Sequence, residues 1–356
     1  MTPKERVMIA LNHQKPDKIP FSLGFGVNQY AREQLAKYLK CPEQEVERLL
    51  QMSSDLRWVS PRYVGPARRN KVENNRELNI WGVERKEVFN GFDSYMEISK
   101  YPLSGMEDIV MLENYEFPNP DWFDYDDLSR QIDEACRSDD FAIIMGNANL
   151  FECSWYMVGF EDMLALLLTD PELVNRLLEK VTSFFAEYFE RALIAANGRI
   201  DIAFTADDIG QQSGLLMSLP LWEEVIKPHH KKLNQMLHKF GVKVMYHTDG
   251  AVMDAIPGLM DMGIDILEAL QFDAAGMDPV LMKNNWGENL CFHGGVSVQS
   301  TLPFGTPEEV HKEVKERIDI LGRDGGYILA PSHAIQGGTP PENILAFFES
   351  AGRKLG

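Results

Sequence analysis

Short runs of apolar residues recur along this chain, and helical patterns separate most of them. Eight runs have the length of a β-strand, at residues 19–24, 55–60, 142–146, 201–205, 243–247, 265–269, 290–294 and 327–330. Most are almost continuously apolar, which is typical of parallel strands buried on both faces. Strands that alternate with helices predict an α/β fold, and eight of them favour a closed (β/α)8 TIM barrel over an open sheet.

The helical patterns between these runs cover residues 171–196, 221–239, 252–262, 307–321 and 341–351. At the start of the chain, Thr2, Pro3 and Glu5 have the spacing of a capping box, which predicts a first helix there. The first strand is followed by no GxGxxG, and no GxxxxGK[ST] occurs, so a dinucleotide-binding or P-loop protein is disfavoured.

Residues 61–140 depart from this alternation, because they are rich in charged, amide and aromatic side chains. We expect a large insertion after the second strand that contains a β-hairpin. The alternative is that this region supplies a barrel strand of its own. We expect residues 1–356 to form a single domain, since barrels commonly exceed the usual domain size.

The net charge of −19 argues against nucleic acid or an anionic membrane as a partner, because phosphate binding requires clustered cations. The four cysteines include no CxxC pair, and scattered cysteines are typical of a reducing compartment. The first residues lack the apolar core of a signal peptide, and no window approaches the ~18 apolar residues of a membrane span. We therefore expect a cytoplasmic protein that acts on a small molecule, and a homodimer remains open.

In a barrel, catalytic residues follow the carboxyl ends of the strands. Candidate residues stand at five such ends, namely Asp207 and Asp208, His247 and Asp249, Glu268, His293, and His333. Three of the eight histidines are among them, all in the second half of the chain. We therefore expect one cluster of imidazoles and carboxylates at the mouth of the barrel.

The pair His247 and Asp249 has the most specific spacing, because residues i and i+2 of an extended strand end point to one side. Such a pair can share one divalent ion, His333 would add a third ligand, and Glu268 and His293 are further candidate ligands beside them. Two alternatives remain: general acid–base chemistry without metal, and a hydrogen-bonded pair that only orders the loop. For Glu268 the alternative is a structural ion pair, and for His293 a hydrogen-bonded core histidine.

Asp207 and Asp208 could hold a metal, orient a cationic group or act as a base, and adjacent side chains point apart, so we expect one to face the cavity. Their alternative role is to cap a helix. Asp55 begins the second strand, where it could face the cavity or serve a turn.

The chain resembles the uroporphyrinogen decarboxylase superfamily, which also contains cobalamin-dependent methyltransferases. The resemblance covers nearly the whole chain and rests on KPDKIP at 15–20, SDLR at 54–57, WGV at 81–83, residues 204–210, HTDG at 247–250, LAPSH at 329–333 and TPPEN at 339–343. It implies a distorted (β/α)8 barrel, in agreement with the count of strands.

The decarboxylases of this superfamily have an arginine-rich segment just after the first strand, which binds a tetrapyrrole with many carboxylates. Here residues 25–30 read FGVNQY and contain no arginine, whose bidentate fork other residues do not reproduce. Asp55 and His333 nevertheless resemble the central Asp and the late His of the decarboxylases. Tetrapyrrole decarboxylation therefore remains an alternative, as does a non-catalytic barrel that binds a corrinoid or tetrapyrrole.

The methyltransferases hold zinc with a His-x-Cys pair and a later Cys. His247 matches the histidine, whereas Asp249 and His333 stand where the cysteines would be. Both substitutes are competent ligands for Zn2+ or a similar ion. The resemblance thus implies a metal-dependent methyltransferase that moves a methyl group between a small compound, such as a methoxylated aromatic or a methylamine, and a separate corrinoid protein.

Overall fold

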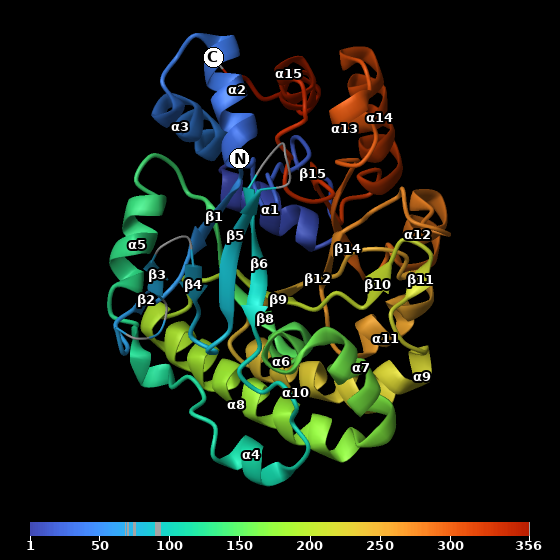
Figure 1. The fold of residues 1–356 in the computed structure, drawn as a ribbon. Helices are drawn as coiled ribbons and strands as arrows, with labels where there is room; N and C mark the ends of the chain where they lie inside the picture. Colours follow the sequence, from blue (N-terminus) through green and yellow to red (C-terminus); the bar gives the residue numbers. More distant parts are fainter. Residues whose placement is uncertain (68, 70, 74–75, 90–93, 356) are drawn as a thin grey trace.

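The computed structural model describes residues 1–355 except 68, 70, 74–75 and 90–93. Its centre is a curled sheet of seven parallel strands (Figure 1). In spatial order these are β1 (Leu56–Val59), β8 (Ala142–Asn149), β9 (Ile202–Ala206), β12 (Lys243–His247), β13 (Ile266–Ala269), β14 (Cys291–Val296) and β15 (Tyr327–Pro331). Each strand is parallel to its neighbours, so the predicted α/β architecture is confirmed as TIM-barrel-like.

The predicted strand at 19–24 is a single bridge rather than a strand. Phe21 bridges Leu329 of β15, and Ser22 N donates to Leu329 O at 2.9 Å. On the other side Asp55 N, at the start of β1, donates to Phe21 O at 2.8 Å. A regular ladder cannot form here, because Pro20 has no N–H and the N–H of Phe21 donates to the Asp55 carboxylate at 2.8 Å.

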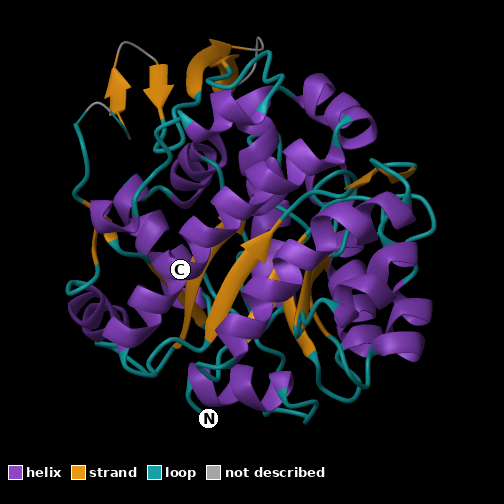
Figure 2. Cartoon of the chain, turned by 90° about the horizontal axis from the view of Figure 1, so that it is seen from below, coloured by secondary structure: helices purple, strands orange, loops and turns teal. Residues whose placement is uncertain are grey.

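Helices surround the central strands (Figure 2). Their bounds are α1 (Pro3–Leu11), α2 (Gln29–Leu39), α3 (Glu43–Ser53), α4 (Ile109–Glu113), α5 (Leu128–Ala135), α6 (Leu150–Val158), α7 (Phe160–Thr169), α8 (Pro171–Ala196), α9 (Leu219–Leu221), α10 (Lys227–His238), α11 (Ile256–Asp261), α12 (Pro279–Trp286), α13 (Thr301–Phe304), α14 (Pro307–Leu321) and α15 (Pro341–Ser350). The predicted bounds of α8 and α14 are confirmed, and so is the capping box of Thr2 and Glu5.

The stretch between β1 and β8 forms small antiparallel sheets. β3 (Lys71–Glu73), β4 (Arg76–Leu78), β5 (Glu84–Phe89) and β6 (Ser94–Lys100) form one sheet, while β2 (Arg62–Tyr63) pairs with β7 (Phe123–Asp124). In the part of the chain that the structure describes, none of these strands joins the central sheet. This stretch therefore supplies no strand of the central sheet, contrary to the alternative stated above.

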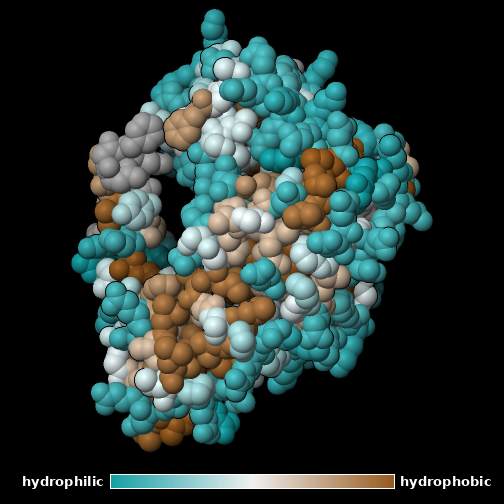
Figure 3. All heavy atoms as spheres, turned by 90° about the vertical axis from the view of Figure 1, so that its right-hand side faces the viewer, coloured by the Kyte–Doolittle hydropathy of each residue, from teal (hydrophilic) through white to brown (hydrophobic). Residues whose placement is uncertain are grey.

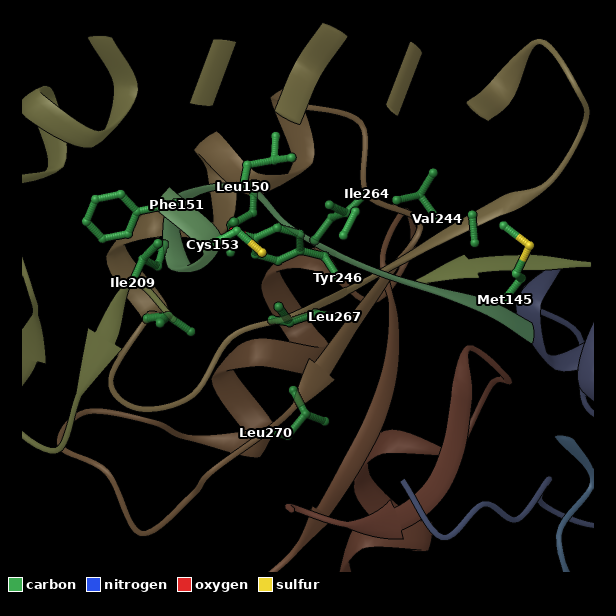
Figure 4. Close-up of a cluster of buried hydrophobic side chains, with 14 of the residues drawn as sticks. Met145, Leu150, Phe151, Cys153, Ile209, Val244, Tyr246, Ile264, Leu267 and Leu270 are labelled. Atoms are coloured by element: carbon green, nitrogen blue, oxygen red, sulfur yellow. The ribbon is translucent and has the colours of Figure 1, made fainter. Parts of the chain in front are cut away.

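The alternation of side chains along the strands creates two apolar layers. Tyr246 and Leu267 point outwards and gather with Leu150, Phe151 and Ile209 under the helices (Figure 4). The opposite faces form an inner cluster, closed by Val7 and Leu11 of α1 and containing Leu56, Ala142, Ile144, Ile202, Phe204, Ala206, Met245, Ile266, Cys291 and Ile328. The amino end of the curled sheet is thus filled, and any opening faces the carboxyl ends of its strands.

Most of the face in Figure 3 is hydrophilic, with a brown apolar area in its lower half. Among the described residues, no helix combines the length and the apolar character needed to cross a bilayer.

Candidate functional site

The inner face of the sheet changes from apolar to ionisable towards the strand ends. The side chains of His247, Glu268 and His293 lie in register on the neighbouring strands β12, β13 and β14. Because residues i and i+2 share a face, they lie directly above the inner apolar cluster. The apolar residues two positions earlier are Met245, Ile266 and Cys291. The strand-end rule therefore places these three groups together.

Glu268 lies between the two imidazoles. One of its carboxylate oxygens accepts a hydrogen bond from His247 Nδ1, and the other lies 3.6 Å from His293 Nδ1. Burial alone would raise the pKa of Glu268 and lower that of His247, but their mutual attraction outweighs it. The pKa of Glu268 falls to about 2, and that of His247 rises to about 10, with help from Asp249 and Asp208. Glu268 thus fixes the ring of His247 with Nε2 free for another partner.

The free nitrogen of His247 faces the loops beyond the strands. Its Nε2 lies 3.9 Å from Asp249 Oδ1 and 3.5 Å from Asp208 Oδ1. His247, Asp249 and His333 each offer one ligand atom, and these atoms lie within 4.8 Å of one another. The three residues that the sequence analysis grouped as ligands therefore do converge, and metal binding itself stays a prediction.

This group can be tested against the needs of a metal ion. Zinc–ligand distances of about 2.0–2.2 Å keep two ligand atoms of one ion within about 4.4 Å. The set, which spans at most 4.8 Å, would need a shift of less than about 1 Å. Asp249 Oδ1 is buried and has no hydrogen-bond partner among the described residues, so a cation would satisfy it. The residues therefore fit a divalent ion.

The acidic surroundings explain the charges at this point. Burial, followed by the nearby carboxylates of Asp208 and Glu268, raises the pKa of Asp249 to about 7, against the opposing effect of His247. Burial lowers the pKa of His333, and so does the neighbouring His247. A second positive charge at His333 is thus disfavoured, which leaves its imidazole neutral and able to bind a metal.

Glu268 and His293 lie outside the group of three, although we expected them as further ligands. Glu268 contacts Nδ1 of His247, whereas Nε2 of the same ring faces Asp249 and Asp208. Both ring nitrogens of His293 are buried and make no hydrogen bond among the described residues. The described ionic partner of His293 is Glu268, whose Oε1 lies 3.6 Å from its Nδ1.

Asp207 and Asp208 point apart, as expected for adjacent residues. Asp207 is buried and accepts hydrogen bonds from the N–H groups of Phe151 and Glu152 at 2.7 and 2.8 Å and from His230 Nε2 at 2.5 Å. It therefore holds the start of α6, which is the helix-capping role. Asp208 faces the group of three and accepts from the N–H of Asp249 at 2.9 Å.

Asp55 lies at the amino end of β1, away from the strand ends that carry the other candidates. Its carboxylate accepts hydrogen bonds from Arg6 Nη1 at 3.1 Å, from the N–H of Phe21 and from Arg353. These three hydrogen bonds hold the segments together. The expectation that Asp55 faces the cavity as a catalytic group does not fit this placement.

The sequence analysis missed Phe25, which covers the candidate ligands. Its ring centroid lies 4.8 Å from that of His247 and 4.9 Å from that of His333. Gly24 and Gly26 flank it with φ of 54° and 85°, a conformation that glycine adopts without strain. The signal available in the sequence was an aromatic residue between two glycines, directly after the predicted strand at 19–24.

Glu152 was missed as well. It accepts hydrogen bonds from Tyr156 Oη at 2.7 Å and from Asn149 Nδ2. Burial, with the charges of Asp207 and Asp208, raises its pKa to about 7. Glu152 closely follows β8, so the strand-end rule itself would have found it.

Comparisons with known proteins identify relatives of two kinds. The chain is 28% identical over 198 residues to a methylated-thiol–coenzyme M methyltransferase of Methanosarcina mazei, which covers 55% of this chain and 49% of that protein. It is 28% identical over 213 residues to a uroporphyrinogen decarboxylase of Geotalea daltonii, covering 57% of each. The matches thus span about half the length of these curated relatives.

The fold is also found in a solved structure. A methyltransferase from Methanosarcina mazei superposes with a TM-score of 0.67 at 19% identity, over 99% of this chain and 98% of that one. This likeness confirms the fold. Residues 132–353 match the uroporphyrinogen decarboxylase (URO-D) family. The chain therefore belongs to the URO-D family, as the resemblance in its sequence predicted.

Proposed function

We propose that the chain is a metal-dependent methyltransferase that moves a methyl group between a small methylated compound, such as a methoxylated aromatic or a methylamine, and a corrinoid carried by a separate protein. One observation carries this proposal, namely the convergence of His247, Asp249 and His333 at the strand ends. A methyltransferase among the relatives supports the reaction class.

The residues divide the work between them. His247, Asp249 and His333 would hold Zn2+ or a similar ion, which supplies a Lewis acid for the heteroatom that carries the methyl group. Glu268 orients His247, and Asp208 adds negative charge beside Nε2. Phe25 shields this point from water, which strengthens its electrostatic interactions.

The proposal includes the organisation of the chain. We infer a single barrel domain over residues 1–356, with residues 61–140 inserted after the second barrel position. A cytoplasmic location belongs to the same proposal, and the four cysteines, none of which forms a disulfide, agree with it.

Metal analysis of the purified protein tests the proposal. We expect about one divalent ion per chain and its loss in His247→Ala and His333→Ala, because each variant removes one of three protein ligands. His311→Ala is the control, since His311 is exposed and contacts Ser350 instead. Metal-free wild-type protein, or full occupancy in both ligand variants, would contradict the proposal.

Tetrapyrrole decarboxylation is the second candidate, supported by the uroporphyrinogen decarboxylases among the relatives. Glu152 and Asp249, whose pKa values both rise to about 7, are acids able to donate a proton near neutral pH. The assay is consumption of uroporphyrinogen by protein treated with a chelator. Turnover without metal would favour this reaction over methyl transfer.

A further inference from the structure

The curled sheet leaves a gap beside β1. In the described part of the chain, the backbone bond between β1 and the stretch at 20–27 is that of Asp55 N to Phe21 O. Beyond this bond, residues of both segments line a cavity of about 950 Å3. The cavity therefore opens along the free edge of β1 and reaches the inner face of the sheet at Phe204.

The cavity is larger than a methylamine requires. Pockets of about 300–1,000 Å3 take ligands of drug size. Trp58 and Phe25 line it, and their side chains are 47% and 41% exposed. Two large aromatic side chains are therefore available to contact a ligand. The volume and these faces favour a flat, apolar ligand.

An aromatic path connects the cavity with the candidate metal ligands. The ring of Trp58 lies 5.2 Å from that of Phe204, and Phe204 lies 5.9 Å from Phe25. Phe25 in turn lies 4.8 Å from His247. A ring bound along this path would contact aromatic side chains up to the imidazole of His247.

The same cavity contains a cation without an acidic partner. Arg57 Nη1 donates to the carbonyl oxygens of Ser54 and Leu56, and its guanidinium lies 3.5 Å from the ring centroid of Phe141. No described carboxylate lies within 4.0 Å of Arg57, and burial lowers its pKa to about 10. By contrast, Arg48 in the same lining is paired with Glu45 at 2.5 Å.

Arg57 therefore has hydrogen-bond donors that are available to an anion. Its Nε and Nη2 atoms donate to no described protein group, although the side chain is partly buried. Arg32 and Arg48 also line the cavity, but each is paired with an acid, Glu43 and Glu45, so the anionic group belongs at Arg57. A guanidinium and a carboxylate form a bidentate pair, so Nε and Nη2 of Arg57 could bind the two oxygens of a ligand carboxylate.

We propose that this cavity binds a methylated aromatic carboxylic acid, with its ring against Trp58, Phe204 and Phe25 and its carboxylate on Arg57. The inference rests on the proposed function and narrows its substrate class. A methylammonium compound is disfavoured, because it would place a further positive charge beside Arg57, which has no described carboxylate within 4.0 Å. Arg57 is then the residue that determines specificity for an acid.

Titration calorimetry with 4-methoxybenzoate and its neutral analogue methoxybenzene tests the inference. Wild-type protein should bind the acid more tightly. Arg57→Gln should weaken binding of the acid by about 10- to 100-fold and leave methoxybenzene unchanged, because only a charge-assisted hydrogen bond is removed. Arg48→Gln is the matched control and should change neither ligand, since Arg48 already has its acidic partner.

Arg57→Lys covers the case in which the glutamine variant does not fold. It keeps the charge but loses the fork, so the acid should bind several-fold more weakly and methoxybenzene as in wild type. No preference for the acid in wild type, or an equal loss of both ligands on substitution of Arg57, would overturn the inference. An equal effect of Arg48→Gln would overturn it too.

The metal proposal is tested separately in the same titrations. His333→Ala should lose the metal but retain binding of 4-methoxybenzoate. Wild-type protein that binds the acid through Arg57 yet contains no metal would support the ligand site and refute the metal-dependent function.

Discussion

At the scale of single residues, the candidate site contains buried polar atoms that have few hydrogen-bond partners or none among the described residues. Glu268 contacts both His247 and His293, while Asp249 Oδ1 and the ring nitrogens of His293 make no hydrogen bond among the described residues. Buried polar atoms in this state cost free energy unless a ligand or ion meets them. Among these unsatisfied atoms, Asp249 Oδ1 belongs to the three candidate ligands, so a bound cation would remove its cost.

Glu268 is a positioning residue, and its removal should weaken metal binding without abolishing it. A partner that fixes a ligating histidine is worth about 10- to 100-fold in metal affinity. We therefore expect Glu268→Gln to raise the dissociation constant by that factor, measured by competition with a chelator. Glu313→Gln is the control, because Glu313 pairs with Arg317 elsewhere. An unchanged dissociation constant would rule out the positioning role.

Glu152 should make the stability of the protein depend on pH. Its pKa is about 7 in the folded chain, against an ordinary value of 4.5, so the folded state binds more protons between these values. Stability conferred by the protonated acid is therefore present at low pH and lost as the pH rises from about 4.5 to 7, by up to about 3 kcal/mol.

Denaturant unfolding of the chelator-treated protein at pH 5 and pH 8 measures this effect. We expect the free energy of unfolding to fall less between the two pH values in Glu152→Gln than in wild type. Asp249 contributes a slope of the same sign to both proteins and cancels in the difference. Equal slopes in wild type and variant would show that Glu152 is not responsible.

At the scale of elements, the sequence predicted the strands of the central sheet because their apolar runs are continuous and bounded by helices. It also predicted α8, whose first residue is Pro171 and whose N-cap is Asp170. The prediction of a strand at 19–24 was wrong. The N–H of Phe21 donates a hydrogen bond to the side chain of Asp55, which lies 34 residues away in the sequence. Periodicity reports which face a residue presents, and it does not report such distant hydrogen bonds.

In the candidate site, too, the sequence predicted the position of residues along the strands but not the hydrogen bonds between distant residues. Strand-end position was enough to group His247, Asp249 and His333, because parallel strands bring their carboxyl ends to one edge. It could not tell which of Asp207 and Asp208 faces the mouth, since this depends on the start of α6 and on His230. Glu152 was overlooked because the apolar residues around it suggested core packing.

At the scale of the whole molecule, Asp55 joins segments from both ends of the chain. Its carboxylate binds Arg6 of α1, the N–H of Phe21 and Arg353 after α15. The gap described beside β1 begins directly beyond this point. Asp55 therefore closes the amino end of the curled sheet while the other end stays open for a ligand.

Replacement of Asp55 should cost stability rather than chemistry. Asp55→Ala leaves the partly buried Arg353 without a described acidic partner and the buried Arg6 with Asp17 alone, and breaking a buried pair costs about 3–5 kcal/mol. We expect a loss of that size in the free energy of unfolding, with metal content per folded chain unchanged. Asp17→Ala is the control, because Asp17 pairs with Arg6 while largely exposed. Stability equal to wild type would contradict the structural role.

The bond between Asp55 and Arg353 also bears on how the protein matures during its synthesis. A ribosome produces residue 55 early and residue 353 nearly three hundred codons later. The contact between Asp55 and Arg353 can therefore form only after the C-terminal residues have left the ribosome. Until then the Asp55 carboxylate lacks one of its three hydrogen-bond partners. Truncated products that stop short of position 353 should therefore be the ones that chaperones and proteases remove.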